Sequence, residues 1–403
     1  MFTLENLVKA YLSCRKRKRK TINALNFEDN WEQNLFKLQR RLKSKKYKPG
    51  RSICFIVTYP KIREVFAADF RDRVIHHLLV SKLEPFFEKR FIYDSYACRK
   101  NKGIHLVIKR ITKAINKITD NKTRPVYFLQ IDVKSFFCNI NKNILFAILK
   151  NKLEKTKSFK KDKEKIMWLA KTIIFHDPTK NYYLKGKKEL FNKLPANKTL
   201  FKTPPYKGLP IGNLTSQFFA NVYLNELDQF VKRELKAKYY FRYADDMVLL
   251  SKDRERLKKW RIKINNFLKE KLDMKLNPKK DKTGSVWQGI NFIGYVIKPH
   301  YILSRNRVVK NLKTKLHHFN QGLLLTSNNQ KQIALPLANP PTKEKIETML
   351  ATVNSYYGHF CHADTYRLRK NIYEKHFGNL KKYLKPTRSY KSFKMIKENN
   401  EKH

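Results

Sequence analysis

The alternation of apolar and polar residues is clearest in the middle of the chain. Two apolar runs of strand length, 239–241 and 247–250, lie on either side of Asp245 and Asp246. This spacing predicts a β-hairpin with the two aspartates at its tip. Another apolar run of the same kind ends in Asp132. Since strands that carry acidic residues at their ends can be neighbours in one sheet, we expect the three carboxylates to converge.

Helical spacing of apolar residues marks most of the other elements, with glycine or proline near several predicted ends. In chain order the pattern predicts a first helix from Phe27 with Asn26 as its N-cap, strands at 53–57 and 65–66, a mixed helical stretch at 73–87, helix plus irregular connection at 150–206, a long helix from Thr215 or Ser216, a helix at about 254–272, a turn at 276–278, a strand pair at 287–297, and two helices that end at Gly358 and Gly378. This order predicts an α+β fold, with an antiparallel sheet backed by helices and a helical module near the C-terminus.

The net charge indicates which class of partner the protein binds. The chain has 89 lysines and arginines against 33 aspartates and glutamates, a formal net charge of +56. Hydrophobic residues make up 41% of the chain, enough to bury large cores, which excludes a disordered basic tail. A folded protein with this charge is expected to bind polyanions. No apolar stretch of about 18 residues and no signal segment is readable, so no membrane role is expected.

Cysteine usage predicts a reducing compartment. The five cysteines are widely spaced and include no Cys-x-x-Cys pair, which is typical of free thiols in a cytoplasm. His359, Cys361 and His362 lie close together, but a second cluster of ligands is missing from the sequence. Residues that connect two helices are therefore the preferred interpretation over a zinc site.

The aspartate pair allows two interpretations. Two carboxylates about 4 Å apart repel by about 4 kcal/mol at an effective dielectric constant of 20, so a fold that places them together usually holds divalent cations between them. With Asp132 they would form a two-metal site for phosphoryl or nucleotidyl transfer. Alternatively, the pair is ordinary turn chemistry, because aspartate tolerates turn geometry and bonds to nearby backbone. The basic charge of the chain favours the first interpretation.

Five segments in this order resemble the motifs of reverse transcriptases. They are Asp132 with Phe136-Phe137, the loop Gly208-Leu209-Pro210-Ile211-Gly212-Asn213-Leu214-Thr215-Ser216-Gln217, the box Tyr243-Ala244-Asp245-Asp246, the segment Leu276-Asn277-Pro278-Lys279-Lys280, and Asn291-Phe292-Ile293-Gly294-Tyr295. The resemblance covers roughly residues 59–295. It implies a right-hand polymerase with fingers, palm and thumb, acting as an RNA-directed DNA polymerase.

The resemblance also implies a division of the chain. Residues 1–125 would form an N-terminal helix and the fingers, and residues 126–300 the palm, with part of the fingers or an insertion at 150–206. Residues 301–385 would form a linker, read at the prolines of 336–342, and a helical thumb. Residues 386–403 would be a basic tail, expected to be frayed.

The loop at 208–217 indicates the subtype. Group II intron and retroviral enzymes usually read Pro-Gln-Gly here, whereas this chain has Pro210-Ile211-Gly212. This departure resembles the reverse transcriptases of diversity-generating retroelements, which copy a template-repeat RNA into cDNA with frequent errors at template adenines. The resemblance implies a small basic pentameric accessory protein as a partner, together with template RNA, the cDNA/RNA heteroduplex and deoxynucleoside triphosphates. It also implies a bacterial, archaeal or phage-encoded cytoplasmic protein.

Three other functions stay open from the sequence. One is an antiphage defence reverse transcriptase, and a second is a group II intron-like enzyme. A third is a nucleic-acid-binding protein that keeps the fold without turnover, since a fold alone does not prove activity. The complete set of three aspartates argues against the third.

The resemblance assigns roles to individual residues. Asp132 and Asp245 would hold two Mg²⁺ ions with Asp246 in support, and the backbone carbonyl of Val133 would be a further ligand. Phe137 stands where the family has the bulky residue that excludes a 2′-hydroxyl, or else it is a core aromatic beside Phe136. Ile211 replaces the glutamine that reaches toward the nascent base pair, or else it packs under its loop. The nucleotide-binding residues implied are Lys61, Arg63, Phe137, Ile211, Gly212, Gln217 and Lys280, of which Lys280 would donate a proton to the leaving pyrophosphate.

Overall fold

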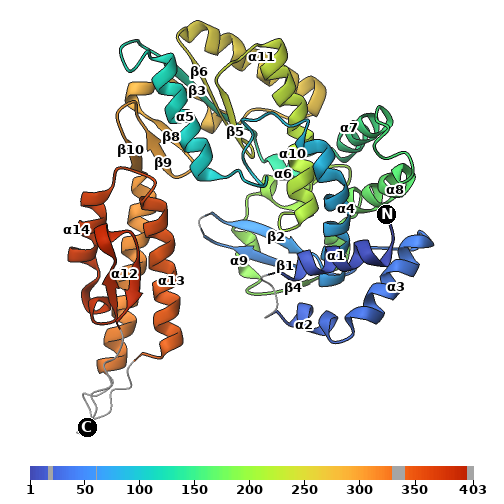
Figure 1. Ribbon diagram of the computed structural model, residues 1–403, viewed down its shortest axis with the longest axis horizontal. Helices are drawn as coiled ribbons and strands as arrows, with labels where there is room; N and C mark the ends of the chain where they lie inside the picture. The colour runs from blue at the N-terminus through green and yellow to red at the C-terminus, as the bar shows by residue number, and fades with distance from the viewer. Residues whose placement is uncertain (17–20, 60, 329–340, 397–403) are drawn as a thin grey trace. The chain divides into compact units, whose positions relative to one another are not determined.

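The computed structural model describes residues 1–16, 21–59, 61–328 and 341–396 (Figure 1). Internal contacts divide the chain into two compact units, each built from two segments. The first unit consists of Met1–Gly103 and Phe128–Thr283, and the second of Ile104–Tyr127 and Gly284–His403. The division into fingers, palm and thumb stays a prediction, because these units group the chain by contacts and not by function.

The first unit begins with a layer of helices. Its members are α1 (Leu4–Arg15), α2 (Ile22–Glu28), α3 (Trp31–Lys43) and α4 (Phe70–Glu88), and α1 lies against α4 (Figure 1). The single first helix expected from Phe27 was wrong. Phe27 belongs to α2, which ends one residue later, and Asn30 rather than Asn26 is the N-cap of α3. The sequence pattern missed α1 because its buried face is mixed, with Ala10 and Cys14 beside Leu7 and Tyr11.

A three-stranded sheet follows α3. Its order is β2-β1-β4, formed by β1 (Ser52–Val57), β2 (Arg63–Ala67) and β4 (Tyr182–Leu184). The strands expected at 53–57 and 65–66 are confirmed, and they pair antiparallel with Cys54 opposite Phe66. β4 was not predicted. It is a three-residue strand in the lysine-rich region 150–206, and it pairs parallel with β1. The helices of this region are α7 (Lys142–Glu154), α8 (Lys163–Ile174) and α9 (Glu189–Asn192).

The second sheet carries the aspartates. Its order is β5-β6-β3-β7, formed by β5 (Tyr240–Tyr243), β6 (Asp246–Ser251), β3 (Tyr127–Asp132) and β7 (Lys282–Ser285). The predicted hairpin is confirmed: Tyr243 pairs with Asp246, which leaves Ala244 and Asp245 as a two-residue turn. Ala244 has a φ of 54°, and turns of this kind require a positive φ.

Helices support this second sheet. They are α10 (Leu214–Gln229), which continues as a π-helical turn at Phe230–Glu234, α11 (Arg254–Leu272), and the short α6 (Phe136–Asn139). The predicted long helix and the predicted helix at 254–272 are both confirmed. Single turns of 3-10 helix lie at Pro178–Lys180, Ala196–Lys198, Leu200–Lys202 and Pro278–Lys280.

The second unit combines one small sheet with a helical bundle. The sheet has the order β10-β9-β8, formed by β8 (Ile290–Phe292), β9 (Tyr295–Ile297) and β10 (Ile302–Ser304). The helices are α5 (Ile104–Ile118), α12 (Asn306–Asn328), α13 (Lys343–Phe360) and α14 (Tyr366–His376). α12 lies side by side with α13 and α14 (Figure 1). Further 3-10 turns lie at Val286–Gln288, Gly378–Lys382 and Arg388–Tyr390.

Two predictions for the second unit need correction. The prediction that Gly358 ends its helix was wrong, since α13 continues to Phe360. A Cβ at Gly358 would meet no atom within 4 Å, so packing does not require a glycine at this position. Gly378 does follow the end of α14, with a φ of 49°. The described part of the tail is not frayed, since β11 (Leu384–Pro386) and β12 (Phe393–Met395) form a hairpin. Most of the expected linker at 336–342 lies outside the described residues. No described helix is both long and apolar enough to cross a membrane.

The hairpin β11-β12 anchors to the bundle through Phe393, which is 3% exposed and stacks on Phe377 at 4.7 Å between ring centroids. We predict that Phe393→Ala lowers the free energy of unfolding by ~3–5 kcal/mol, because it leaves a cavity in this core. Chemical denaturation of the whole chain measures this. Lys394→Ala, an exposed neighbour on the same strand, is the control, and equal stability of the two variants would contradict the assignment of Phe393 to the core.

Candidate active site

Three secondary-structure ends bring the aspartates together. Asp132 is the last residue of β3, Asp246 is the first residue of β6, and Asp245 lies in the turn between β5 and β6. Since β3 and β6 are neighbours in the sheet, their ends meet. One carboxylate oxygen from each residue lies within 4.8 Å of the other two. The convergence predicted from the sequence is therefore present in the structure.

Burial and neighbouring charges shift the pKa values of Asp245 and Asp246. Burial, together with the charges of Asp132 and Asp246, raises the pKa of Asp245 to about 7. Burial and Asp132 also raise the pKa of Asp246, although Lys280 acts in the opposite direction. Perturbed carboxyl groups of this kind are typical of functional sites. A positive charge close to the three carboxylates would therefore be strongly stabilising.

Lys280 supplies part of that charge. Its Nζ donates to Asp132 Oδ1 at 2.8 Å and to Asp246 Oδ1 at 3.2 Å. Burial opposes its charged form, but the hydrogen bond to Asp132 and the charge of Asp246 raise its pKa. Among the neighbouring lysines named by the motif, the structure thus brings Lys280 to the aspartates. Its ammonium group stands between two carboxylates, where a cation is favoured.

The donor set fits a hard divalent cation. Three carboxylate oxygens within 4.8 Å outnumber the single ammonium group of Lys280, and oxygen ligands of this kind are the ones that Mg²⁺ prefers. Asp132, Asp245 and Asp246 are the residues that would hold it. Val133, the further ligand implied by the resemblance, is buried at 1% exposure directly after Asp132.

Asn277 is a site residue that the sequence motif contained without a role. Its backbone N–H donates to the Asp132 carbonyl at 2.7 Å, and its side-chain Nδ2 donates to Asp132 Oδ2 at 3.0 Å. Together with Lys280 it fixes both oxygens of the Asp132 carboxylate. The turn expected at 276–278 is therefore also a support for the first aspartate.

A buried ion pair holds the aspartate hairpin, and the sequence pattern did not predict it. Arg242 on β5 is fully buried and donates to both oxygens of Asp228 on α10, at 2.8 and 2.6 Å. Its other donors reach Ser95 Oγ at 2.9 Å, Asn221 Oδ1 at 3.2 Å and the Ala244 carbonyl at 3.0 Å. This last bond fixes the turn that carries Asp245. The only hint in the sequence was an arginine within an apolar strand.

The loop at 208–217 is bound to β2. The Phe66 N–H donates to the Ile211 carbonyl at 2.9 Å, and a Cβ at Gly212 would lie 2.8 Å from Val65 Cγ1. Ile211 is half-buried, whereas Gly212 and Gln217 are exposed. At the start of the loop, the Leu209 N–H donates to the Phe137 carbonyl at 2.9 Å.

The structure therefore ties the backbone of Phe137 to the loop that contains Ile211. The Phe137 side chain is half-buried and lies edge-on to Phe136, with 5.3 Å between ring centroids. Lys61 and Arg63 are both exposed; Lys61 lies two residues before β2, and Arg63 is its first residue. Their role in nucleotide binding stays a prediction.

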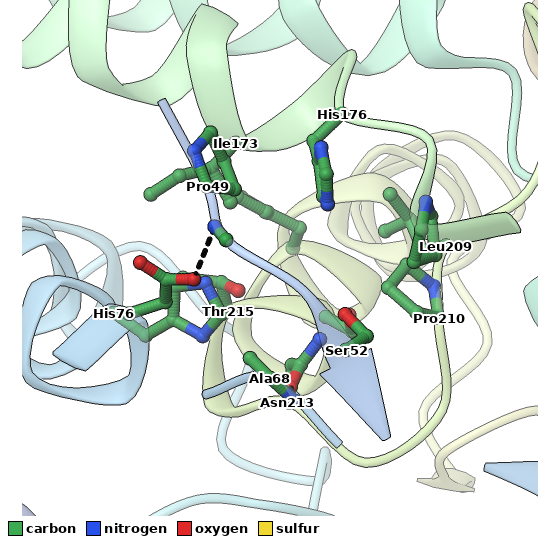
Figure 2. A pocket seen from close by; sticks show the side chains of 15 residues that line it. Pro49, Ser52, Ala68, His76, Ile173, His176, Leu209, Pro210, Asn213 and Thr215 are labelled. Atoms are coloured by element: carbon green, nitrogen blue, oxygen red, sulfur yellow. Dashed lines mark hydrogen bonds between the residues drawn. The ribbon is translucent and has the colours of Figure 1, made fainter. Parts of the chain in front are cut away.

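A small cavity lies under this loop. Its volume is about 20 Å³, and it is lined by Leu209, Pro210 and Thr215 from the loop and by two histidines, His76 of α4 and His176 after α8. Figure 2 shows the His176 ring pointing into the space between these residues. Burial lowers the pKa of His76 to about 3 and also lowers that of His176. Both rings are therefore neutral at neutral pH, and the buried Asp72 lines the same cavity.

Residues 48–297 match the family described as reverse transcriptase (RNA-dependent DNA polymerase), which is more than half of the chain. The chain belongs to the reverse transcriptase family. The matched segment contains all three aspartates and the 208–217 loop. Family membership agrees with the predicted α+β fold of a right-hand polymerase, and it explains why these motifs occur in one order along the chain.

Relatives of this reverse transcriptase chain include bacterial proteins. Protein YkfC of Escherichia coli (strain K12) is 23% identical over 280 residues, which cover 61% of this chain and 66% of YkfC. The group II intron-encoded protein LtrA of Lactococcus lactis subsp. cremoris is 26% identical over 179 residues, or 44% of this chain and 24% of LtrA. Apo telomerase from Candida tropicalis matches with a TM-score of 0.47 and 13% identity, covering 81% of this chain and 59% of that one. The chain thus spans only part of each relative.

We predict that Arg242→Met lowers the free energy of unfolding by ~3–5 kcal/mol, because it leaves Asp228 buried without its counter-charge. Adding Asp228→Asn should return part of this loss, so the double variant is more stable than the sum of the single effects predicts. Urea denaturation of the four proteins measures the coupling. The control is Arg233→Met, the same change at an exposed position, for which a change within about 0.5 kcal/mol is expected. Strictly additive effects would show that the pair is not coupled.

Proposed function

We propose that this chain is an RNA-directed DNA polymerase that extends a primer with deoxynucleotides. The observation that supports this most directly is the cluster of Asp132, Asp245 and Asp246, with oxygens within 4.8 Å of one another in a chain of the reverse transcriptase family. Two Mg²⁺ ions bound there would lower the pKa of the primer 3′-hydroxyl and neutralise the incoming triphosphate.

Protein groups around the cluster would orient the reactants. Asn277 and Lys280 hold the Asp132 carboxylate in one orientation, and Arg242 holds the turn of Asp245. Because its pKa is raised, Lys280 keeps its proton at neutral pH. From this position it would donate that proton to the leaving pyrophosphate as a general acid.

The remaining nucleotide contacts come from the family resemblance. Phe137 would exclude a 2′-hydroxyl beside the sugar, and its half-buried ring leaves one face for that contact. Lys61 and Arg63 would bind the triphosphate, which suits the exposure of both side chains. Gly212 and Gln217 would line the nucleotide side of the loop, where both are exposed.

We predict that Asp245→Ala and Asp132→Ala each reduce Mg²⁺-dependent primer extension on an RNA template by at least about 100-fold, since each removes a metal ligand that contributes several kcal/mol to the transition state. Incorporation of labelled deoxynucleotides by purified protein measures this. The matched control is Asp120→Ala, a carboxylate with a side chain 63% exposed, and its extension should equal that of the parent. Undiminished extension by Asp245→Ala protein would overturn the metal assignment.

Within this activity, we propose that the enzyme belongs to a diversity-generating retroelement and makes adenine-mutagenic cDNA from a template-repeat RNA. The support is the Pro210-Ile211-Gly212 sequence of the loop. A small basic pentameric accessory protein would be its partner. Since both proteins would be basic, their complex should depend on apolar contacts or on an RNA that bridges them.

Relatives such as LtrA favour one alternative, a group II intron-like reverse transcriptase. An antiphage defence enzyme is a further alternative, and it would make short or template-independent cDNA. Extension assays with and without an RNA template identify a template-independent defence enzyme, because neither the retroelement enzyme nor the intron-like enzyme would add nucleotides when no template is present.

We predict that Ile211→Gln lowers misincorporation opposite template adenine more than opposite other bases. An aliphatic side chain cannot form the hydrogen bonds of glutamine, and one such bond contributes about 0.5–1.5 kcal/mol, or a roughly 2- to 13-fold change in discrimination. Sequencing of cDNA copied from one template by both enzymes measures this.

The matched control for this prediction is Ile22→Gln, the same change at a residue 74% exposed on α2. Its error spectrum should equal that of the parent. An unchanged adenine error rate in Ile211→Gln, with polymerisation intact, would remove Ile211 from the infidelity mechanism and weaken the retroelement assignment.

A further inference from the structure

A hollow lined by cationic side chains lies beside the aspartate cluster on the first unit. Its volume is about 380 Å³, and its cationic lining comes from Lys134, Arg261, Lys269 and Lys275. Asp281 is the one acidic residue of the lining, and it forms an ion pair with Arg261. The three lysines are exposed, so the hollow presents an excess of positive charge to solvent.

Apolar residues also line the hollow. Ile262 of α11 is 55% exposed there, an unusual position for isoleucine on a helix with many lysines and arginines. Leu276 and Pro278 line the same hollow. A lining that combines apolar and cationic side chains suits a ligand with a flat apolar part and anionic groups, because the two kinds of surface are buried together on binding. A nucleotide unit of a single strand has both parts.

The hollow shares a segment of chain with the active site. Residues 275–281 contribute Asn277 and Lys280 to the Asp132 carboxylate, and Lys275, Leu276, Pro278 and Asp281 to the hollow. Lys134 follows Asp132 by two residues, and its N–H donates to the Lys275 carbonyl at 3.0 Å. A strand bound in the hollow would therefore lie one short segment away from the catalytic carboxylates.

We propose that this hollow is a binding site for single-stranded nucleic acid, separate from the nucleotide site at the aspartates. Phosphates of the strand contact Lys134, Lys269 and Lys275, and a base or sugar covers Ile262. The proposal rests on the proposed polymerase function for the identity of the ligand, since a polymerase has single-stranded template before and beyond the copied region. The excess of cationic side chains and the apolar residues in the lining are observed independently of that function.

The test compares the three lining lysines with two exposed lysines of α11 that do not line the hollow. The parent protein is treated with an amine-acetylating reagent, with and without a single-stranded RNA oligonucleotide and without deoxynucleotides, and each lysine is then followed by mass spectrometry. Lys263 and Lys271 are the controls: both are exposed, and neither lines the hollow. Lys263 lies roughly 160° around α11 from Arg261, and Lys271 lies roughly 160° from Lys269. We expect RNA to slow acetylation of Lys134, Lys269 and Lys275 and to leave the two controls unchanged.

Equal protection of lining and control lysines would overturn the proposal, because it would show only general attraction to a basic protein. Protection by polyglutamate but not by RNA would also overturn it, in favour of an acidic protein partner. The acetylation assay needs no turnover. If the chain is not a polymerase, the extension assay will show it, and the protection pattern can still be interpreted.

Variants give a second and independent measurement. For Lys269→Gln/Lys275→Gln, the slope of log affinity for single-stranded RNA against log salt concentration should become shallower by about 1.4, since each lost phosphate contact removes about 0.7. Lys263→Gln/Lys271→Gln removes the same charge and should keep the slope of the parent. Equal slopes for the two double variants would contradict a site in the hollow.

Discussion

Repulsion among three carboxylates is the constraint on which the arrangement of the first unit depends. Two carboxylates about 4 Å apart repel by ~4 kcal/mol at an effective dielectric constant of 20, and three residues form three such pairs. The raised pKa of Asp245, about 7, reflects this repulsion together with burial. Lys280 offsets only part of it. A binding site for divalent cations therefore follows from how the strands pair. β3 and β6 are neighbours in the sheet, and the end of β3 and the start of β6, which lie together, are both acidic residues.

A hairpin that carries such charge needs a rigid support, and the buried ion pair provides it. Asp228 accepts from Arg242 and also from the Tyr240 hydroxyl at 2.8 Å. Burying an ion pair is a poor way to gain stability, since the desolvation of both charges offsets their attraction. What Arg242 adds is geometry: one planar group connects α10, the segment at Ser95 and the turn at Ala244. We interpret the pair as a device that fixes the position of Asp245.

Sequence patterns predicted the elements whose structure depends on nearby residues. The Asp245 hairpin and α11 were correct because strong apolar runs and clear helical spacing set them locally. Features that depend on distant partners were missed. β4 forms because β1 is available to pair with it, and residues 384–395 form a hairpin because Phe393 enters a core of the preceding helices. In the site, Arg242 was missed for the same reason, since its partner Asp228 is on another element.

The loop at 208–217 shows how a fixed fold leaves room for changes in specificity. Its backbone is held by β2 through the Ile211 carbonyl, and Gly212 has a φ of 123° with Val65 against it, so position 212 accepts little besides glycine. The side chain at 211 takes no part in that backbone bond. Replacing a polar residue there by isoleucine therefore changes what the loop presents while its backbone anchors to β2 stay the same. The backbone at position 211 thus admits side chains of different polarity without a change of fold, which is what the proposed role of Ile211 in fidelity requires.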